Sequence, residues 1–236
     1  MITVACLKWS HAGGTKIPSQ KMTRYTPDYV IRLRNMVARH YPKPHRFVCI
    51  TDDPRGLEDV ETVPLWFQHL KLGGCFHRLR LFSDEMRELL GPRFIAMDLD
   101  CVVTGDLTPI FERTEDFVMN AYCCPQERDQ HYNGSLMMMN AGARKQVWET
   151  FDPDESRRAI EHHKRTVIGT DQAWIRIALG KGEARFTEAD GVYDYKHSKA
   201  LKSGKLPDNA RIVFFSGPRN PETEIGKREW IAQNWR

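Results

Sequence analysis

The heptapeptide Phe94–Asp100, FIAMDLD, joins a short apolar run to two acidic residues separated by one leucine. The apolar part is typical of a buried strand. Residues i and i+2 of a strand point to the same side, so we expect Asp98 and Asp100 to project together from the strand end while Leu99 faces the core. Two carboxylates in this arrangement are hard oxygen ligands, which suit Mg²⁺ or Mn²⁺.

Apolar runs of strand type also occur on both sides of this heptapeptide, with helical patterns between them. They are Ile2–Leu7, Arg46–Thr51, Val60–Leu65, Phe117–Cys123, Ser135–Asn140 and Arg211–Phe215. We assign Met137–Met139 to the core. One helix is expected behind Thr26-Pro27-Asp28 and ends before Pro42; another is expected from Phe76 to Leu90. The order predicts an α/β domain with a mostly parallel sheet, which binds ligands beyond the carboxyl ends of its strands.

The composition indicates one globular domain of moderate charge. The chain has 236 residues, 41% of them hydrophobic, and 35 Lys and Arg against 31 Asp and Glu, a net charge of +4. These values exclude a disordered chain and a polycation. No apolar run approaches the roughly 18 residues of a membrane-spanning helix, and the N-terminus lacks a signal-peptide pattern. We therefore expect a cytoplasmic protein.

The cysteine pattern supports a reducing environment. None of the six cysteines stands in a C-x-x-C pair, which excludes zinc-finger and thioredoxin-like sites. Cys6 and Cys49 lie inside apolar runs, where a thiol behaves as a small buried apolar group. We expect all six to be unpaired thiols, as is usual in the cytoplasm.

Two enzyme classes place Asp-x-Asp at a strand end. In haloacid-dehalogenase-like phosphohydrolases the motif follows the first strand, and its first aspartate is the nucleophile; Asp98 would take that role here. In nucleotide-sugar transferases the motif follows several strands that bind the nucleotide. Three expected strands precede Asp98. The position favours a transferase and leaves the phosphohydrolase as the alternative.

Several blocks along the chain carry a more specific resemblance. They are Gly74–Leu79 (GCFHRL), Phe94–Leu107, Tyr132–Met137 (YNGSLM), Gly169–Gln172 (GTDQ) and Val213–Gly217 (VFFSG). In this order they resemble GT-A glycosyltransferases, most closely the family 8 group of glycogenin and bacterial lipooligosaccharide galactosyltransferases, with small bacterial and phage relatives. The resemblance implies a single Rossmann-like GT-A domain over residues 1–236. Residues 1–107 would form the nucleotide-binding half and 108–236 the half for the donor sugar and acceptor.

The resemblance implies a metal-dependent donor site. Asp98, Leu99 and Asp100 would bind the nucleotide sugar, an expected UDP-sugar, with both aspartates holding Mn²⁺ or Mg²⁺ against its diphosphate. Arg78 stands where the family often has lysine and is assigned to the diphosphate or donor sugar. Asn133 and Ser135 are assigned to the donor sugar.

Further donor contacts are implied near the chain start. Leu7, Lys8 and Trp9 leave the first strand, where the base packs in this fold, and Trp9 or Tyr25 could stack on it. Asp52 or Asp53, after the second strand, could accept a hydrogen bond from the ribose or base.

Asp171 and Gln172 match the family's Asp-Gln pair beside the anomeric carbon. The resemblance implies that Asp171 hydrogen-bonds the donor sugar or acceptor, that Gln172 stabilises the oxocarbenium-like centre, and that the sugar is transferred with retention. The alternative for Asp171 is an ordinary acid at a helix N-terminus, after Thr170 as cap.

The sequence departs from the family near its end and within its Asn-Ser-Gly element. Asn133-Gly134-Ser135 has the glycine and serine exchanged. Family members carry a histidine metal ligand beside Phe-x-Gly, whereas this chain reads Phe214-Phe215-Ser216-Gly217. The metal would then be held by the two aspartates, diphosphate and water, or by a substitute such as Asp194 or His197. Gly217 and Lys196 are assigned to the donor, the latter at the diphosphate.

The acceptor stays open at this stage. A glycan or lipopolysaccharide, a protein, a small molecule and a hydroxymethylated DNA base are all possible. Basic stretches at Arg157-Arg158, His162–Arg165 and Lys196–Lys205 suit an anionic partner, but they lack the interleaved aromatic residues of single-strand binders. A non-catalytic sugar- or nucleotide-binding module is a further alternative. The segment Trp230–Trp235 is expected to pack across the domain.

Overall fold

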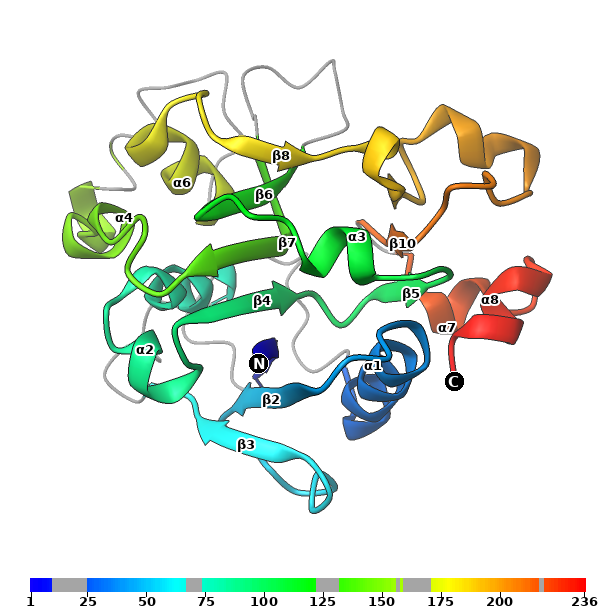
Figure 1. Cartoon of the computed structure of the whole chain (residues 1–236), viewed down its shortest axis with the longest axis horizontal. Coiled ribbons are helices and arrows are strands. Elements are labelled where there is room, and N and C mark those ends of the chain that lie inside the picture. The colour runs from blue at the N-terminus through cyan, green and yellow to red at the C-terminus, as the bar shows by residue number, and fades with distance from the viewer. Residues whose placement is uncertain (10–24, 67–73, 122–131, 156–157, 159–170, 217–218) are drawn as a thin grey trace.

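The computed structural model describes residues 1–9, 25–66, 74–121, 132–155, 158, 171–216 and 219–236, to which all structural statements refer. A seven-stranded sheet has the order β3-β2-β1-β4-β7-β6-β8 (Figure 1). Its strands are β1 Ile2–Lys8, β2 His45–Thr51, β3 Glu61–Pro64, β4 Arg93–Met97, β6 Phe117–Ala121, β7 Tyr132–Asn140 and β8 Ala184–Phe186. The pairs β1–β2, β2–β3, β1–β4 and β6–β8 are parallel. Strand β7 is antiparallel to both of its neighbours, β4 and β6. The predicted α/β fold with a mostly parallel sheet is confirmed.

A small second sheet lies beside the first. It consists of β5 Cys101–Val103, β10 Ile212–Phe214 and β9 Val192–Asp194, with β10 in the middle. The chain passes from β4 of the large sheet to β5 of the small one within three residues, Asp98–Asp100. The Asp-x-Asp motif is therefore the connection between the two sheets.

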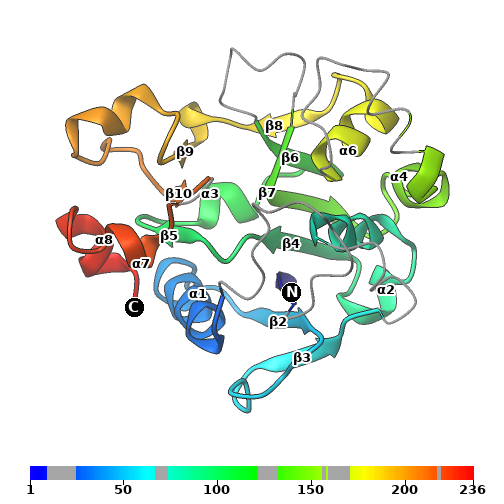
Figure 2. The same cartoon turned by 180° about the vertical axis from the view of Figure 1, so that it is seen from behind.

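Helical layers cover both faces of the large sheet, because its buried strands alternate their side chains between two core clusters. Val4 and Cys6 pack into one cluster with α1 and the small sheet, whereas Ala5 packs into the other with η2 and α6. Figures 1 and 2 show α1, α7 and α8 on one side of the molecule and α2, α4 and α6 on the other. The helical elements are α1 Pro27–His40, the 3₁₀ helix η2 Gly74–Phe82, α2 Met86–Leu89, α3 Thr108–Phe111, α4 Gln146–Glu149, α6 Asp171–Leu179, the 3₁₀ helices η3 Glu188–Asp190 and η4 Lys199–Ser203, α7 Pro221–Glu224 and α8 Glu229–Asn234.

The predicted first helix is confirmed. It has Thr26 at the N-cap position and Pro27 in its first turn, and it ends at His40, before Pro42. Five of its residues, Tyr29, Val30, Leu33, Met36 and Val37, are buried, and so is every residue of Met137–Met139 in β7. Regular periodicity and proline punctuation thus located these elements correctly.

The prediction of a single helix from Phe76 to Leu90 is wrong. This segment forms the 3₁₀ helix η2, a turn, and the short helix α2. Arg78 and Arg80 are only 5% and 7% exposed, so this segment is buried on more than the one side that an amphipathic surface helix would bury. A 3₁₀ helix has three residues per turn, which aligns Cys75 with Arg78.

The C-terminal segment packs on α1, as expected. The Trp235 ring lies 5.1 Å from the Tyr29 ring, and the Arg32 guanidinium lies 4.4 Å from the centre of the Trp235 ring. Arg32 also donates to the Trp235 carbonyl at 2.7 Å. None of the helices that the structure describes is long and apolar enough to cross a membrane.

Candidate functional site

The candidate residues gather at one edge of the large sheet. Strands β1, β2, β4, β6 and β8 run in the same direction, so their carboxyl ends share an edge, and antiparallel β7 begins there. Asp98 follows β4 directly, and Asn133 lies at the start of β7. Parallel sheets bind ligands at this edge. The topology therefore explains why residues distant in sequence meet.

Asp98 and Asp100 do not extend the strand, contrary to the sequence expectation. The strand β4 ends at Met97, and the motif forms a bend before β5. The Asp98 backbone N–H donates to the Ser135 carbonyl at 2.8 Å, while the Asp100 carbonyl accepts from the Phe215 N–H at 2.9 Å. The Asp98 backbone is thus bonded to β7 of the large sheet, and the Asp100 backbone is bonded to the residue that follows β10 of the small sheet. Leu99 is 2% exposed and faces the core, as expected.

The centre of the site is the Arg78 cluster, which we define as Arg78, Asp98 and Asp171. The Arg78 guanidinium donates through Nη2 to Asp98 Oδ1 and through Nη1 to Asp171 Oδ2, both at 2.5 Å. Asp171, the first residue of α6, is fully buried, and its Oδ1 has no hydrogen-bond partner within the described residues. Sequence reasoning named all three residues, and the structure joins them.

Burial and the opposite charges compete in setting the pKa values of the cluster. Burial alone would lower the pKa of the Arg78 guanidinium, but the Asp171 and Asp98 carboxylates outweigh burial and raise it. Burial raises the pKa of the Asp98 carboxyl, with the Arg78 charge opposing this rise. Cys75 lies nearby: burial and the Asp171 charge raise the pKa of its thiol to about 12. The thiol is therefore neutral at physiological pH, whereas the arginine is charged.

An irregularity in β7 makes room for this guanidinium. The pairing of β6 with β7 shifts between Met119 and Asn120, which leaves residues 134–136 of β7 without partners on β6. A Cβ atom at Gly134 would lie 2.3 Å from Arg78 Nη1 and 3.1 Å from Asp171 Oδ2. Bulges occur often beside active sites, where they redirect the backbone. Glycine, which has no Cβ atom, allows this close approach.

The flanking Asn133 and Ser135 are held by local hydrogen bonds. The Asn133 side-chain oxygen accepts from the Ser135 backbone N–H at 2.9 Å. The Ser135 hydroxyl accepts from the Asn120 amide at 2.8 Å, and Asn120 is 6% exposed. Sequence reasoning did not select Asn120, because a single asparagine at the end of an apolar strand carries no motif. Only the paired register of β6 and β7 reveals its position.

Asp98 and Asp100 supply carboxylate oxygens, the ligand type that a divalent cation takes when it is held jointly with phosphate oxygens. Mg²⁺ and related cations are commonly bound by one or two carboxylates plus substrate phosphates. Asp100 Oδ2 accepts from the Tyr25 hydroxyl at 2.7 Å, which orients this carboxylate. Within the described ranges no group of three or more His, Cys, Asp or Glu side chains is placed to hold a metal, so neither Asp194 nor His197 joins the two aspartates.

The position of the family's histidine is occupied differently here. The Ser216 hydroxyl donates to Asp194 Oδ1 at 3.3 Å, and the same oxygen accepts from the backbone N–H groups of Lys196 and His197 at 2.8 Å. Asp194 thus organises the turn after β9. The Lys196 side chain is exposed, and its predicted diphosphate contact stays a prediction. Gly217 and Thr170 lie outside the described residues.

The residues predicted to surround the nucleotide base contact other residues of the protein. Lys8 Nζ donates to the Asp53 carbonyl at 3.1 Å, and the Arg55 guanidinium holds the pKa of the Asp53 carboxyl well below its usual range. The rings of Trp9 and His77 are 5.9 Å apart. Tyr25 packs instead against Tyr29, 5.1 Å between rings.

The structure also shows where three other predicted site residues lie, and their roles stay predictions. Leu7 is half-buried and packs in the same core cluster as Trp9, while Asp52 lines a small cavity of about 120 Å³ beyond β2 and β3. Gln172 is half-buried, next to Asp171 on α6.

No protein-family profile and no curated protein sequence matches this chain. Solved structures do match it. The galactosyltransferase LgtC in complex with donor and acceptor sugar analogues superposes with a TM-score of 0.58 at 12% identity, over 93% of this chain and 88% of LgtC. The glycosyltransferase GlyE of Streptococcus pneumoniae TIGR4 superposes with a TM-score of 0.62 at 13% identity, over 94% of this chain and 56% of GlyE. This chain has the GT-A fold.

A further GT-A structure adds a detail about a side chain. An active-site mutant of LgtC, in which glutamate replaces a glutamine, superposes with a TM-score of 0.58 at 14% identity, over 99% of this chain and 96% of that chain. The similarity to these GT-A proteins covers nearly the whole described domain. At such low identity it establishes the fold, and the chemistry has to be argued from the residues of this chain.

Proposed function

We propose that this protein is a glycosyltransferase that moves a sugar from a nucleoside diphosphate sugar, a UDP-sugar, to an acceptor hydroxyl. The observation that carries this proposal is the Arg78 cluster at the carboxyl edge of a GT-A sheet. A buried cation beside Asp98 and Asp100 provides what a diphosphate leaving group needs: positive charge and a place for a metal. Residues 1–107 would bind the nucleotide and 108–236 the donor sugar and acceptor.

The residues of the cluster would act as follows. Arg78 stabilises the negative charge that develops on the diphosphate as the bond to the anomeric carbon breaks. Asp98 and Asp100 would hold Mn²⁺ or Mg²⁺, which supplies Lewis-acid stabilisation of the same charge when bound. Asn133 would offer its amide N–H₂ to the donor sugar, because its oxygen is taken by the Ser135 N–H.

Asp171 would bind the sugar rather than attack it. It is fully buried and paired with Arg78, which makes it a poor nucleophile, and its Oδ1 lacks a partner within the described residues. A buried acceptor atom without a partner is costly, so a sugar hydroxyl donating to Oδ1 would be stabilising. Gln172 follows on the same helix, and we assign it to the oxocarbenium-like centre; a glutamine is an active-site residue in LgtC. Retention at the anomeric carbon rests on the resemblance to family 8.

The fold gives no support to the phosphohydrolase alternative. The structural neighbours are GT-A glycosyltransferases, and the Asp-x-Asp motif follows β4 rather than the first strand of the chain. A phosphoryl-enzyme trapped on Asp98 would restore this alternative.

The proposal is tested by thermal shift with nucleoside diphosphates and nucleotide sugars, each with Mn²⁺, Mg²⁺ or a chelator. We expect a metal-dependent increase in Tm with UDP or a UDP-sugar, lost in the double variant Asp98→Asn/Asp100→Asn. Asp152→Asn/Asp154→Asn is the matched control, because it removes an exposed Asp-x-Asp pair. The absence of a shift with every nucleotide would overturn the proposal. A shift without any turnover of a UDP-sugar would instead indicate a non-catalytic binding module.

A further inference from the structure

A cavity of about 340 Å³ lies where the two sheets meet, and we call it the junction cavity. It is lined by Asn120 and Ala121 at the end of β6, by residues 186–189 at the end of β8 and in η3, and by residues 192–194 of β9. Small-molecule pockets span roughly 300–1,000 Å³. The cavity is therefore of a size for a single sugar unit, at the small end of that range.

The junction cavity is connected to the Arg78 cluster through two residues, Asn120 and Ser135. Asn120 forms part of its wall and donates to the Ser135 hydroxyl at 2.8 Å. The Ser135 carbonyl in turn accepts from the backbone N–H of Asp98 at 2.8 Å. Because β4, β6 and β8 end at the same edge, a ligand in the cavity would lie beside a ligand held by the cluster.

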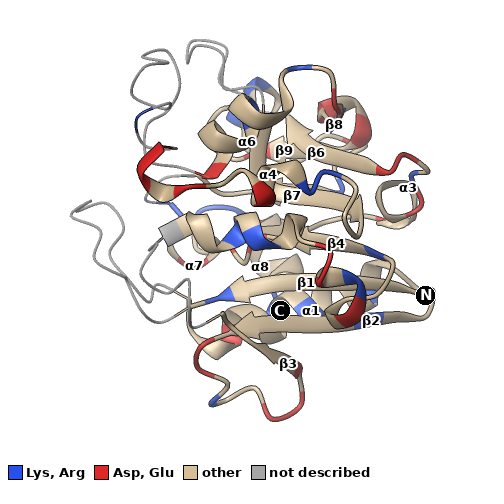
Figure 3. Cartoon of the chain, turned by 90° about the vertical axis from the view of Figure 1, so that its left-hand side faces the viewer, with Lys and Arg blue, Asp and Glu red and all other residues tan. Residues whose placement is uncertain are grey.

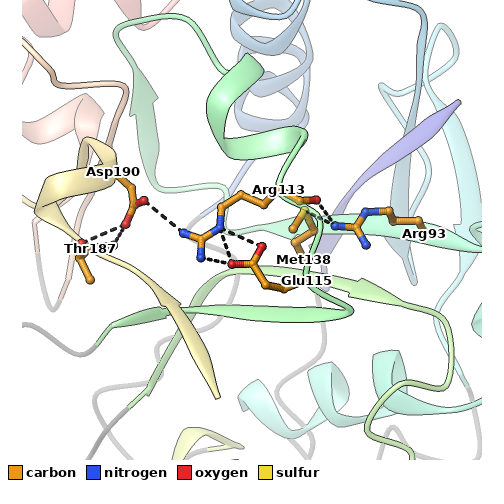
Figure 4. Close-up of polar contacts among 6 residues, drawn as sticks. All are labelled: Arg93, Arg113, Glu115, Met138, Thr187 and Asp190. Atoms are coloured by element: carbon orange, nitrogen blue, oxygen red, sulfur yellow. Dashed lines mark hydrogen bonds and ion pairs between the residues drawn. The ribbon is translucent and has the colours of Figure 1, made fainter. Parts of the chain in front are cut away.

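The far wall of the cavity is fixed by a polar network, which Figure 4 shows. Asp190 Oδ2 accepts from both the backbone N–H and the hydroxyl of Thr187, at 2.8 and 2.9 Å. The other oxygen of Asp190 pairs with Arg113 at 3.1 Å, and Arg113 also pairs with Glu115. Arg93 on β4 donates to the Arg113 carbonyl. The wall is thus formed before any ligand arrives, which lowers the entropic cost of binding.

The charge of the lining restricts the ligand. Glu188 and Asp194 carry the only ionisable carboxylates of the lining, and Lys and Arg are absent from the described residues that line it. A phosphate or carboxylate would be repelled. Asn120 and Thr187 offer hydrogen-bonding groups, whereas Phe186 and Val192 offer apolar surface. On the side of the molecule that Figure 3 shows, by contrast, basic and acidic residues are intermixed over the described elements.

We propose that the junction cavity binds the acceptor, and that the acceptor unit held there is an uncharged sugar. This inference rests on the proposed function and narrows its substrate class. In the transfer, the acceptor oxygen forms a bond to the anomeric carbon while the bond from that carbon to the diphosphate oxygen breaks. The bonding electron pair leaves with UDP, and the acceptor proton passes to the diphosphate. Anionic acceptors, which the basic stretches of the sequence would suit, do not suit this lining.

Saturation-transfer NMR with methyl glycosides tests the proposal. The neutral probes are the methyl β-glycosides of glucose, galactose and N-acetylglucosamine, the charged probe is methyl β-glucuronide, and each is measured with UDP and Mn²⁺. Ala189→Trp places an indole in the cavity lining, and Ala200→Trp is the matched control on the exposed face of η4. At least one neutral glycoside should bind the wild type and Ala200→Trp, and bind Ala189→Trp about tenfold more weakly or worse.

A second variant tests the proposal if Ala189→Trp does not fold. Glu188 is exposed, so Glu188→Lys should fold normally; it should gain binding of methyl β-glucuronide, whereas the exposed control Glu155→Lys should not. Equal binding of a neutral glycoside to wild type and Ala189→Trp, or equal binding of glucuronide and neutral glycosides to wild type, would overturn the proposal. If UDP binds but no glycoside does, the acceptor role of the cavity is wrong and the proposed function is not affected. Glycoside binding without any nucleotide binding overturns the transferase and leaves a sugar-binding cavity.

Discussion

The Arg78 cluster and the junction cavity lie on the same edge of one sheet but are built in opposite ways. The cluster is closed: a buried guanidinium fills the space over Gly134 and compensates two carboxylates. The cavity is an open volume of about 340 Å³, and its lining residues Asn120 and Thr187 hydrogen-bond to Ser135 and Asp190, which lie outside the lining. On the two proposals above, the cluster would recognise a ligand by charge, and the cavity would recognise one by shape and hydroxyl groups.

This difference has an energetic consequence. A buried ion pair contributes little net stability, but removing one partner leaves an uncompensated charge and is strongly destabilising. Variants in the cluster should therefore affect folding as well as binding. Variants that fill the cavity should affect acceptor binding with little effect on folding.

The largest expected effect is that of Arg78→Met. It removes the cation shared by Asp98 and Asp171 and should lower the free energy of unfolding by about 3–5 kcal/mol. Urea unfolding followed by circular dichroism measures this. Arg87→Met, an exposed arginine on α2, is the control and should stay within about 0.5 kcal/mol of wild type. A loss below about 1 kcal/mol for Arg78→Met would mean that the cluster is not closed as described.

The second largest effect is expected for Asp171→Asn. It keeps the side-chain shape but removes the charge that faces Arg78, so UDP release from the donor should slow by on the order of 100-fold. Steady-state kinetics with the UDP-sugar that gives the thermal shift measure it. The control, Asp116→Asn, removes a carboxylate from a more exposed pair with Arg144 and should leave turnover unchanged. Turnover near wild type in Asp171→Asn would reduce this residue to a structural acid.

Gly134→Ala tests the steric part of the comparison. A Cβ atom 2.3 Å from Arg78 Nη1 must displace the guanidinium, and overpacking of this kind costs about 1–3 kcal/mol. Calorimetric titration of UDP should show weaker binding in parallel with the loss of stability. Gly182→Ala is the control, since no atom lies within 4 Å of its added Cβ. Identical behaviour of the two alanine variants would contradict the close packing of Arg78 on β7.

The smallest expected effect is that of Cys75→Ser. The thiol pKa is raised to about 12, so the thiol stays neutral and adds no charge to the cluster below that pH. An unperturbed thiol would ionise at about pH 8.5. The pH profiles of turnover should therefore coincide for wild type and Cys75→Ser from about pH 6 to pH 9. A step between pH 8 and 9 that is present only in the wild type would show that the thiol ionises.

Regular patterns in the sequence predicted most of the fold. The apolar part of Phe94–Asp100 forms the strand β4, and α1 begins and ends where its proline residues indicated, because the spacing of apolar residues and the positions of prolines are local properties. The 3₁₀ helix η2 was missed because two buried arginines, Arg78 and Arg80, are stabilised by partners far away in sequence. Local preference cannot report such partners.

The site was predicted in part for the same reason. Arg78, Asp98 and Asp171 were named from the resemblance, but the bend at Asp98–Asp100 was not, because the strand argument assumed that β4 continued. The junction cavity combines Asn120 with Asp194, from two sheets and separate parts of the chain. No motif or spacing connects these residues, so only the three-dimensional arrangement could show them.

The central claim is that the Arg78 cluster binds the diphosphate of a nucleotide sugar for transfer. Its most direct test measures UDP release from a panel of UDP-sugars with Mn²⁺, comparing wild type, Asp98→Asn/Asp100→Asn and Asp152→Asn/Asp154→Asn. We predict release from at least one UDP-sugar by the wild type and the control, and none by the variant of the Asp98 motif. Equal release by all three proteins, or none by the wild type, would contradict the claim.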